Sequence, residues 1–456
     1  MENTPEERIR EIYEKQRAYF RSGATLSTQF RLGSLKAFEK AVRKWEKPLC
    51  DALWKDLHKS YEEAYLTEVS ILLGELRTHI RKLRSWAAPR RKSTPLKMFP
   101  SSSRIVAEPL GNSLIISPWN YPVQLLLTPL VGAISSGCTA LLKPSPYVPT
   151  VSRVIEEMIA ETFPEEYIAT VQGNREVNTA LLDLRWDMIF FTGSPSLGRV
   201  VMSAAAKNLT PVVLELGGKS PCIIDRDADV KIAARRVAWG KALNAGQTCI
   251  APDYLMIHEE IKDEFLAYLR EEFKHLLGED PQKTRHFVRI VSDKAFDRLS
   301  GYLSDGKVLF GAHTDRRERY IEPTVLDPVS PDSPVMQEEI FGPIFPVQTF
   351  GNLDEVIEFV TSREKPLALY YFGKNGDKVL KHTSSGGACI NDVIMHIANE
   401  NVPFGGVGNS GLGSYHGKLS FDAFTHYRAV ITTPARFDVP LRYMPYRMFA
   451  LVKKFL

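Results

Sequence analysis

The chain has 456 residues, of which 44% are hydrophobic and 25% charged, and its 58 basic and 54 acidic side chains leave a formal net charge of +4. This length predicts two or more domains, and the composition excludes a disordered or low-complexity protein. The small net charge argues against a nucleic-acid partner.

The first ninety or so residues show the spacing of amphipathic helices, because apolar side chains recur every three or four positions from Leu35 to Leu53. Beyond Pro95 the segment SSSRIVAEPLGNSLIISPWN alternates and then becomes continuously apolar. That change predicts an edge strand followed by a buried parallel strand. The N-terminal segment MENTPEERIREIYEKQ is charged and helical in pattern, which is unlike a signal peptide.

A stretch without charge runs from residue 110 to residue 142 and is long enough to span a bilayer. However, Pro118, Pro122 and Pro129 divide it into pieces too short for one spanning helix. The sequence therefore favours a buried strand, turn and helix over a transmembrane span.

Short apolar strands and helical stretches then alternate through VVLELGG, and a second series of strands and helices follows Gly217. This alternation is typical of βαβ units in a doubly wound sheet. The expected fold class is α/β, with a doubly wound Rossmann-like domain, a second α/β domain and a small β extension for oligomerisation. The segment RAVITTP predicts a strand that pairs with the one near Arg104.

The expected domains follow from these boundaries. Residues 1–90 and 109–216 form the N-terminal helices and the Rossmann-like domain, and residues 217–407 form the second α/β domain. Residues 91–108 and 426–440 form the bridging strands, and residues 441–456 form a C-terminal tail.

The five cysteines are an odd number without a CxxC pair or a metal-ligand spacing to histidine: Cys50, Cys138, Cys222, Cys249 and Cys389. This pattern predicts a reducing compartment and no metal site, so we expect a cytoplasmic protein. Cys249 lies in NAGQTCIAPDY, where the polar approach predicts a turn with exposed backbone, although an arbitrary cysteine is more often part of a core. As a nucleophile it would need a lowered thiol pKa or a base.

Three further residues follow apolar strands. Glu215 in VVLELGGKSP is either a hydrogen-bonded carboxylate at a glycine turn or a general base. Asn120 in SPWNYP is either a turn former or an oxyanion donor. Lys143 in LLKPSPY is either a solvated lysine or a ligand-binding residue at the carboxyl end of a strand.

Glycines mark two loops. Gly193, Ser194 and Gly198 in FFTGSPSLG open a predicted helix directly after a strand, which is a suitable geometry for binding phosphate. The pattern GxGxxG at 406–411 has no strand closely before it and no βαβ unit after it, so we interpret it as a loop with tight turns.

Taken together, these segments resemble the aldehyde dehydrogenase superfamily, and most closely its class 3 branch of fatty and aromatic aldehyde dehydrogenases. The resemblance covers about residues 29–426, and the last of the motifs that carry it is the one that points to class 3. The motifs are SPWNYP, LLKPS, FTGS, LELGGKSP, NAGQTCIAPDY, PVMQEEIFGPIFPV and PFGGVGNSGLGSYHGKLSF.

The resemblance implies that residues 1–90 and 109–216 form the N-terminal helices and the dinucleotide-binding cofactor domain, and that residues 217–407 form the catalytic domain. It also implies a role for each matching residue. Cys249 would be the nucleophile, Glu215 the base that activates the deacylating water, and Asn120 an oxyanion donor. Lys143 and Glu339 would hold the riboses of NAD or NADP.

The other implied cofactor contacts are Phe341 on the nicotinamide side, Gly193 and Ser194 at the pyrophosphate, and also Gly198 and Trp119. Pro146 stands where many NAD-preferring members carry an acidic residue, so we expect NADP to be accepted as well as NAD. The substrate would be a medium- or long-chain aliphatic or an aromatic aldehyde in an apolar tunnel. The tunnel residues implied by analogy are Tyr61, Tyr65, Ile394, Met395 and His396.

The two alternative functions are a coenzyme-A-acylating dehydrogenase and a scaffold protein. Glu215 argues against a coenzyme-A-acylating dehydrogenase, and the presence of every catalytic residue argues against a scaffold protein. A homodimer is expected. The tail RFDVPLRYMPYRMFALVKKFL is too short to span a membrane, and we prefer packing on its own or a neighbouring subunit to weak contact with a membrane surface.

Overall fold

The computed structural model describes residues 2–438, 440, 443–446 and 448–454. Its first body is a six-stranded sheet in the order β17-β7-β6-β3-β4-β5, in which only the short β17 is antiparallel. The order turns around β3, which is the topology of a doubly wound sheet. The strands are β3 (Asn112–Ile116), β4 (Thr139–Lys143), β5 (Ile168–Thr170), β6 (Met188–Thr192), β7 (Val212–Glu215) and β17 (Gly411–Leu412).

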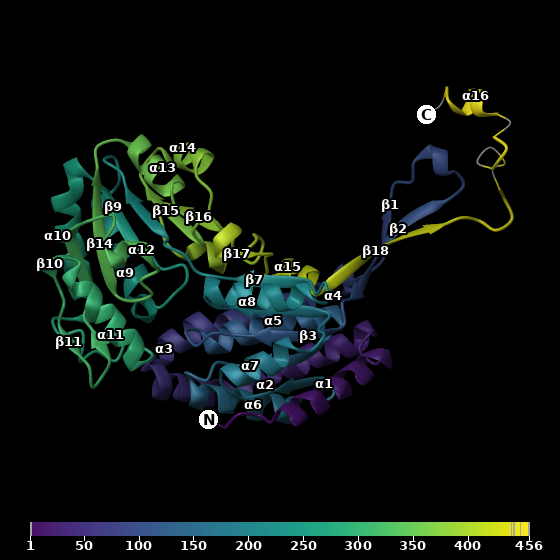
Figure 1. Cartoon of the computed structure of the whole chain (residues 1–456), viewed down its shortest axis with the longest axis horizontal. Helices are drawn as coiled ribbons and strands as arrows, with labels where there is room; N and C mark the ends of the chain where they lie inside the picture. Colours follow the sequence, from purple (N-terminus) through teal and green to yellow (C-terminus); the bar gives the residue numbers. More distant parts are fainter. Residues whose placement is uncertain (1, 439, 441–442, 447, 455–456) are drawn as a thin grey trace.

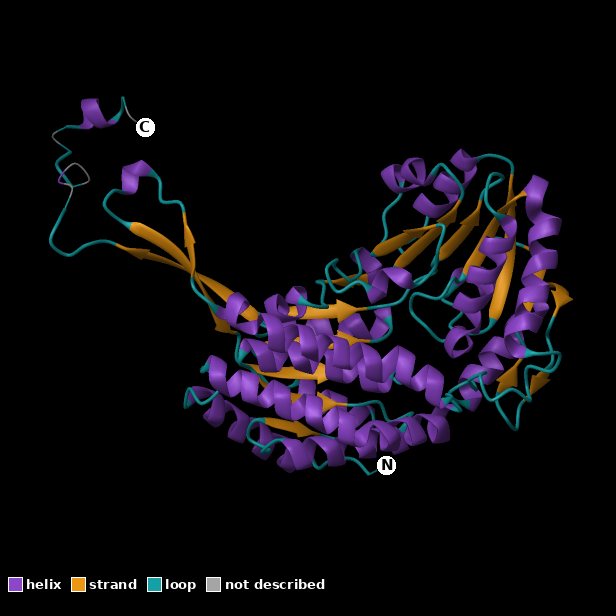
Figure 2. Cartoon of the chain, turned by 180° about the vertical axis from the view of Figure 1, so that it is seen from behind, coloured by secondary structure: helices purple, strands orange, loops and turns teal. Residues whose placement is uncertain are grey.

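Helices cover both faces of this sheet because its strands are apolar on both sides (Figure 2). Ile115 and Leu142 face the core under α2, α4, α5 and α6, whereas Leu114 and Leu141 face α1, α7 and α8. The helices on this body are α1 (Glu6–Arg21), α2 (Thr28–Leu57), α3 (Tyr61–Ala64), α4 (Ser70–Ala87), α5 (Pro122–Ser136), α6 (Pro149–Thr162), α7 (Arg175–Leu182), α8 (Pro195–Ala206) and α15 (Lys418–Ala423).

A turn of π-helix, η1 (Tyr65–Val69), separates α3 from α4. The uncharged stretch from 110 to 142 forms β3, α5 and β4, as its prolines predict. Within the described residues, no helix combines the length and the apolar character needed to cross a membrane.

The second body is a seven-stranded sheet in the order β10-β13-β14-β9-β8-β15-β16, with only the edge strand β10 antiparallel. Its strands are β8 (Pro221–Ile224), β9 (Tyr254–His258), β10 (Gly306–Phe310), β13 (Thr324–Val329), β14 (Ile344–Phe350), β15 (Ala368–Phe372) and β16 (Gly387–Ile390). Its helices are α9 (Val230–Ala242), α10 (Lys262–Leu277), α11 (Asp293–Gly301), α12 (Pro334–Gln337), α13 (Leu353–Thr361) and α14 (Gly376–His382). The predicted strand near Tyr320 lies in a separate small hairpin of β11 (Thr314–Asp315) and β12 (Tyr320–Ile321).

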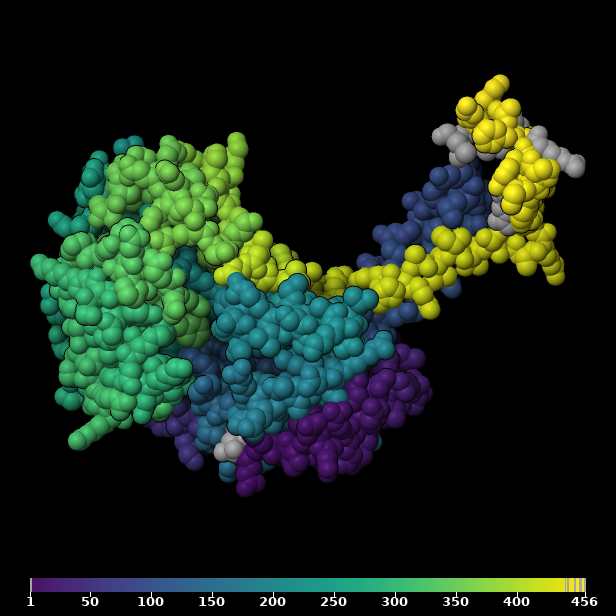
Figure 3. Space-filling model, in the orientation of Figure 1, coloured from purple at the N-terminus to yellow at the C-terminus, as the bar shows by residue number. Residues whose placement is uncertain are grey.

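A three-stranded arm projects from the first body and carries the C-terminal segment at its end (Figure 1). Its strands are β1 (Arg90–Lys92), β2 (Ser102–Pro109) and β18 (Thr425–Thr432), and a short helix α16 (Phe449–Val452) follows them. Arg104 of β2 pairs with Val430 of β18, which confirms the pairing expected from the sequence. The space-filling view shows the arm standing clear of the two bodies (Figure 3).

Candidate active site

A cavity of about 540 Å³ lies between the two bodies. Cys249 and Glu215 both line it, together with Thr192 at the carboxyl end of β6. Most of the remaining wall is apolar and includes Trp239 and Phe404. Residues at the carboxyl ends of the first sheet therefore face the turn that leads into β9 of the second sheet.

The turn before Cys249 has an unusual backbone. Asn244, Ala245 and Gly246 are three consecutive residues with positive φ values of 51°, 52° and 69°. A non-glycine residue adopts this conformation at an energetic cost unless its surroundings impose it, and such strain is common at functional sites. Here the Asn244 N–H donates to the Glu63 carboxylate at 2.8 Å, and a Cβ on Gly246 would lie 2.4 Å from the carbonyl oxygen of Gly342.

The predicted turn is therefore present, but the expectation of an exposed backbone is wrong. Residues 244–247 are buried, and Cys249 is only partly exposed. Burial raises the pKa of the Cys249 thiol, and the neighbouring carboxylates of Glu339 and Glu215 raise it further. The N–H groups of Cys249 and Ile250 act in the opposite direction, but they do not offset the burial. Of the two routes to a reactive thiolate, this site favours a base over an intrinsically lowered thiol pKa.

Glu215 ends β7 with its side chain almost fully buried, at 3% exposure. Neither carboxylate oxygen has a hydrogen-bond partner among the described residues. Burial raises its pKa well above the usual range of a glutamate. The alternative of a carboxylate hydrogen-bonded by the glycine turn is therefore not what the structure shows, whereas a raised pKa suits a general base.

Asn120 lies on the loop after β3, buried against the Cys249 turn rather than on the cavity wall. Its side-chain Nδ2 donates to the backbone carbonyl of Gln247 at 3.0 Å, and the backbone carbonyl of Asn120 accepts from Lys59 at 3.0 Å and from Asn244 at 3.1 Å. An amide nitrogen has two N–H groups, and a single bond occupies only one of them. The second N–H remains available to a ligand oxygen.

Lys59 was not identified from the sequence. It is fully buried, its ammonium contacts Glu68 at 2.7 Å, and it lies 4.2 Å from the centre of the Tyr121 ring. Tyr121 in turn shares a 2.7 Å hydrogen bond with Thr248, the residue before Cys249. In the sequence Lys59 stands in an exposed-looking helix end, HKSYEE, so no local pattern distinguishes it from a surface lysine.

Lys143 ends β4 and is 1% exposed, so the alternative of a solvated lysine is wrong. Its ammonium donates to the carbonyl of Pro144 at 2.9 Å, and no carboxylate pairs with it among the described residues. Burial lowers its pKa to about 8. A buried ammonium with one carbonyl partner has two further N–H donors for the hydroxyl groups of a ligand.

The FTGS loop leads into α8 as the sequence predicts, with Ser194 as the N-cap and Pro195 at the first helical position. A Cβ on Gly198 would lie 2.7 Å from Leu216, so this glycine allows α8 to pack closely on the end of β7. The free N–H groups at this end of α8 favour an anion.

Glu339 lies on a loop without regular structure between α12 and β14. Its carboxylate packs directly on the Gly217 backbone, where a Cβ would lie 2.1 Å from Oε2. Burial raises the pKa of Glu339 to about 8, and the Asp253 carboxylate also acts to raise it. The hydrogen bond from the Gly218 N–H acts in the opposite direction. Arg298 donates to the carbonyls of Glu339 at 3.3 Å and of Ile340 at 2.7 Å.

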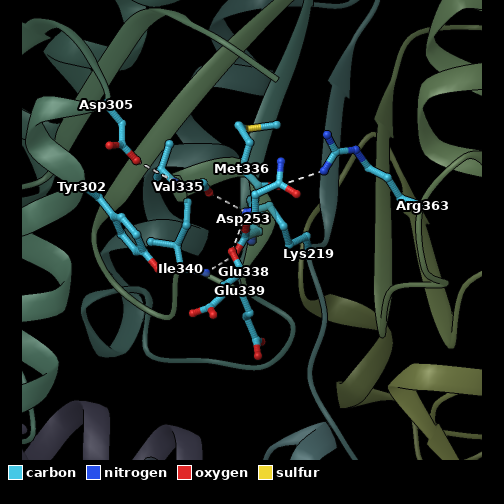
Figure 4. A network of polar contacts seen from close by, with 12 residues as sticks. Lys219, Asp253, Tyr302, Asp305, Val335, Met336, Glu338, Glu339, Ile340 and Arg363 are labelled. Carbon is cyan, nitrogen blue, oxygen red and sulfur yellow. Dashed lines mark hydrogen bonds and ion pairs between the residues drawn. The ribbon is translucent and has the colours of Figure 1, made fainter. Parts of the chain in front are cut away.

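A polar network holds the same loop from the other side (Figure 4). Lys219 donates to the Asp253 carboxylate at 2.5 Å and to the carbonyls of Val335 and Glu338, both at 2.8 Å. Asp253 accepts the Ile340 N–H at 2.8 Å. This network joins the segments that follow Glu215 and Cys249 to the loop that carries Glu339, and no sequence pattern indicated it.

Phe341 follows this loop with a positive φ of 53°. Its ring meets the Trp119 ring edge to face, with centres 5.4 Å apart. The two residues expected near a nicotinamide thus lie against each other between the bodies.

The expected tunnel residues are only partly correct. Ile394 and Met395 line the cavity, but Tyr61, Tyr65 and His396 do not. Tyr61 is half exposed and donates to Glu46 at 2.5 Å. The π-helical turn alters the spacing of side chains here, and Leu66, Thr67 and Ser70 line the cavity instead. His396 contacts the Cys389 sulfur at 3.4 Å and stacks on Phe404.

Comparison with known proteins gives the family. The family model described as "Aldehyde dehydrogenase family" matches residues 1–430. The 4,4'-diaponeurosporen-aldehyde dehydrogenase of Staphylococcus aureus is 44% identical over 98% of this chain and 99% of that protein. The "Aldehyde dehydrogenase, dimeric NADP-preferring" of Canis lupus familiaris is 43% identical over 96% of this chain and 98% of that protein.

The fold agrees with a solved structure as well. The substrate-bound state of Staphylococcus aureus AldH superposes with a TM-score of 0.97 at 44% identity, covering 98% of this chain and 99% of that one. Because the family model matches most of the chain and several relatives match nearly its whole length, the chain belongs to the aldehyde dehydrogenase family.

Proposed function

We propose that this aldehyde dehydrogenase oxidises a medium- or long-chain aliphatic or an aromatic aldehyde to the carboxylic acid through a thioester on Cys249. The observation that carries the proposal is the presence in one cavity of a partly exposed thiol and a buried carboxylate, Glu215, that has no hydrogen-bond partner among the described residues. The mostly apolar wall of the cavity supports an aliphatic or aromatic substrate.

The proposed reaction begins with loss of the Cys249 proton to a base. The thiolate attacks the aldehyde carbon, and the resulting oxyanion accepts hydrogen bonds from the free N–H of Asn120 and from the backbone N–H of Cys249. A bound NAD or NADP would supply the hydride acceptor that converts this hemithioacetal on Cys249 into a thioester. Glu215 then removes a proton from water, and the hydroxide attacks the thioester, releasing the carboxylic acid and the Cys249 thiolate.

Enzymes of this family use NAD or NADP, and the residues present fit a dinucleotide. Lys143 offers two N–H donors, and the buried Thr192 hydroxyl has no partner among the described residues. We propose that Lys143 and Glu339 hold the riboses, that the α8 N-terminus with Gly193 and Ser194 holds the pyrophosphate, and that Trp119 and Phe341 contact the nicotinamide. In this proposal the first body binds the dinucleotide and the second supplies the nucleophile.

The choice of cofactor depends on the segment after Lys143. Pro146 places no carboxylate there to repel a 2′-phosphate, so we propose that NADP supports turnover as well as NAD. Failure to detect any NADP turnover alongside good NAD turnover would overturn this part of the proposal.

The decisive experiment measures NAD(P)H formation and product identity with an aldehyde series. We expect free acid with or without coenzyme A, no oxidation by Cys249→Ala, and a turnover loss of ~10²–10⁴-fold in Glu215→Gln with thioester detectable on Cys249 by mass spectrometry. Acyl-CoA as the main product would favour the acyl-transfer reaction. Unchanged oxidation by Cys249→Ala would refute the proposal.

We further propose a homodimer formed through the arm. Strand β18 is an unpaired edge of the arm sheet, and Leu96, Phe99 and Ile431 expose 87%, 63% and 48% of their surface. Exposed apolar side chains and a free strand edge favour association with a second copy. The tail adds exposed Phe437, which we expect to pack on the partner subunit rather than on a membrane. Five free cysteines support a cytoplasmic location.

A further inference from the structure

One part of the wall of the cavity is polar, although the rest is mostly apolar. Glu75 of α4 and His416 lie there, on segments that are more than 300 residues apart in the chain. Both side chains are almost fully buried, with 3% and 4% exposure. The proposed reaction uses neither of them.

The Glu75 carboxylate is held by three donors. Oε1 accepts from the Ser420 hydroxyl at 2.6 Å and from His79 Nε2 at 3.1 Å, and Oε2 accepts the Gly417 N–H at 3.0 Å. Although burial acts to raise its pKa, the His416 and His79 rings outweigh burial and hold the pKa of Glu75 well below its usual range. The Glu75 carboxylate is thus a fixed anion in the polar part of the cavity wall.

The His416 ring is held by stacking on a neighbouring ring and by a longer contact with Glu75. Its Nδ1 lies 3.7 Å from Glu75 Oε2, its ring stacks on the Tyr415 ring with centres 4.1 Å apart, and its backbone has a positive φ of 77°. The opposite ring nitrogen, Nε2, is buried and has no hydrogen-bond partner among the described residues. His416 lines the cavity, and a buried polar atom without a partner on such a residue is a candidate contact for a ligand group.

We propose that His416, oriented by Glu75, recognises a hydroxyl group on the substrate, so that the preferred aldehydes carry a hydroxyl remote from the carbonyl. With its Nδ1 proton directed at Glu75, a neutral ring presents a hydrogen-bond acceptor at Nε2; the charged ring presents a donor. A hydroxyl group both donates and accepts, so it satisfies Nε2 in either state. This inference rests on the proposed aldehyde oxidation and deepens it.

The position of the polar wall suits such a substrate. Tyr415 lines the same cavity as Glu215, Cys249 and Glu75. His416, stacked on Tyr415, therefore belongs to the same chamber as the reacting thiol. A chain that enters with its aldehyde at Cys249 can reach Nε2 with a more distant group.

The test compares kcat/KM for matched pairs of aldehydes: ω-hydroxyalkanals against n-alkanals of the same length, and 3- and 4-hydroxybenzaldehyde against benzaldehyde. We expect a preference of ~10-fold or more for the hydroxylated member of at least one pair, since a site built to bind a hydroxyl rejects the analogue without it. In His416→Phe, which keeps an aromatic ring and removes both nitrogens, we expect this ratio to fall toward one.

Two further variants separate recognition from folding. Asparagine tolerates a positive φ well, so His416→Asn keeps the backbone and should lower the ratio as well. His275→Phe, on the exposed side of α10, should leave the ratio unchanged. No preference at any chain length, or one that survives in both His416 variants, would overturn the inference and indicate that only water occupies Nε2. Oxidation of plain alkanals by the parent enzyme would still support the proposed function in that case.

Discussion

Lys241, at the last turn of α9, is a fully buried lysine whose ammonium donates to the carbonyl of Pro252 at 2.9 Å and lies 4.5 Å from the centre of the Phe345 ring. Burial lowers its pKa to about 7, against the opposing effect of Asp253. The unfolded chain keeps the ordinary lysine pKa of about 10.5. Between these two values the unfolded chain binds one proton more than the folded protein, so the free energy of unfolding rises with pH.

The difference in unfolding free energy between the parent and Lys241→Met should therefore grow in favour of the parent as pH rises from 7 toward 10.5. Below pH 7 the difference should be flat because both states are protonated. Urea unfolding at several pH values measures it. Lys231→Met removes an exposed lysine from the same helix and is the control for loss of a charge. If the difference in unfolding free energy between the parent and Lys241→Met did not change with pH, the assigned pKa would be contradicted.

At the scale of elements, the loop of Glu339 depends on charged side chains from other segments rather than on its own hydrogen bonds. We predict that Lys219→Met raises KM for NAD or NADP by ~10-fold or more because it frees the carbonyls of Val335 and Glu338. Ester hydrolysis by Cys249 needs no dinucleotide and should fall far less. Lys262→Met, which breaks a similar ion pair with Asp327 at 3.0 Å, should change neither measurement, and equal losses in both assays for Lys219→Met would point to a merely structural role.

Two helical glycines make a second comparison between elements. A Cβ on Gly132 of α5 would lie 2.5 Å from the Ser420 carbonyl oxygen of α15, whereas a Cβ on Gly33 of α2 would meet nothing within 4 Å. We expect Gly132→Ala to lower the free energy of unfolding by ~1–3 kcal/mol through overpacking. Gly33→Ala should raise it by ~0.5–1 kcal/mol. Thermal or urea unfolding distinguishes the two, and equal effects would argue against close packing of α5 and α15.

The elements themselves could be predicted because the apolar periodicity and the prolines are local signals. Glu215, Asn120 and Lys143 could be placed at strand ends for the same reason. The contacts of Lys59, Lys219 and Glu75 could not, since each joins segments distant in the chain and has no local pattern. Tyr61 and Tyr65 were misplaced because they were assigned by analogy with the family. A π-helical turn begins at Tyr65, and Leu66, Thr67 and Ser70 line the cavity instead.

At the scale of the whole molecule, the proposed dimer depends on the arm. We predict that Ile431→Lys and Phe99→Asp convert a dimer into a monomer in analytical ultracentrifugation, because each places a charge in the proposed contact. Leu209→Lys changes an equally apolar side chain that is 91% exposed but lies outside the arm, so it should remain dimeric. A parent protein that is monomeric and sediments with anionic phospholipid vesicles would instead assign the arm and tail to a membrane surface.

The chain passes from the polar wall of the cavity into the arm within a few residues. Ser420, which bonds Glu75, belongs to α15, and β18 begins at Thr425 directly after that helix. Thermodynamic linkage is reciprocal: if pairing of two arms shifts α15, it changes the affinity for aldehyde by some factor, and bound aldehyde changes the dimer dissociation constant by the same factor. Substrate choice and self-association would then be two measurements of one coupling free energy.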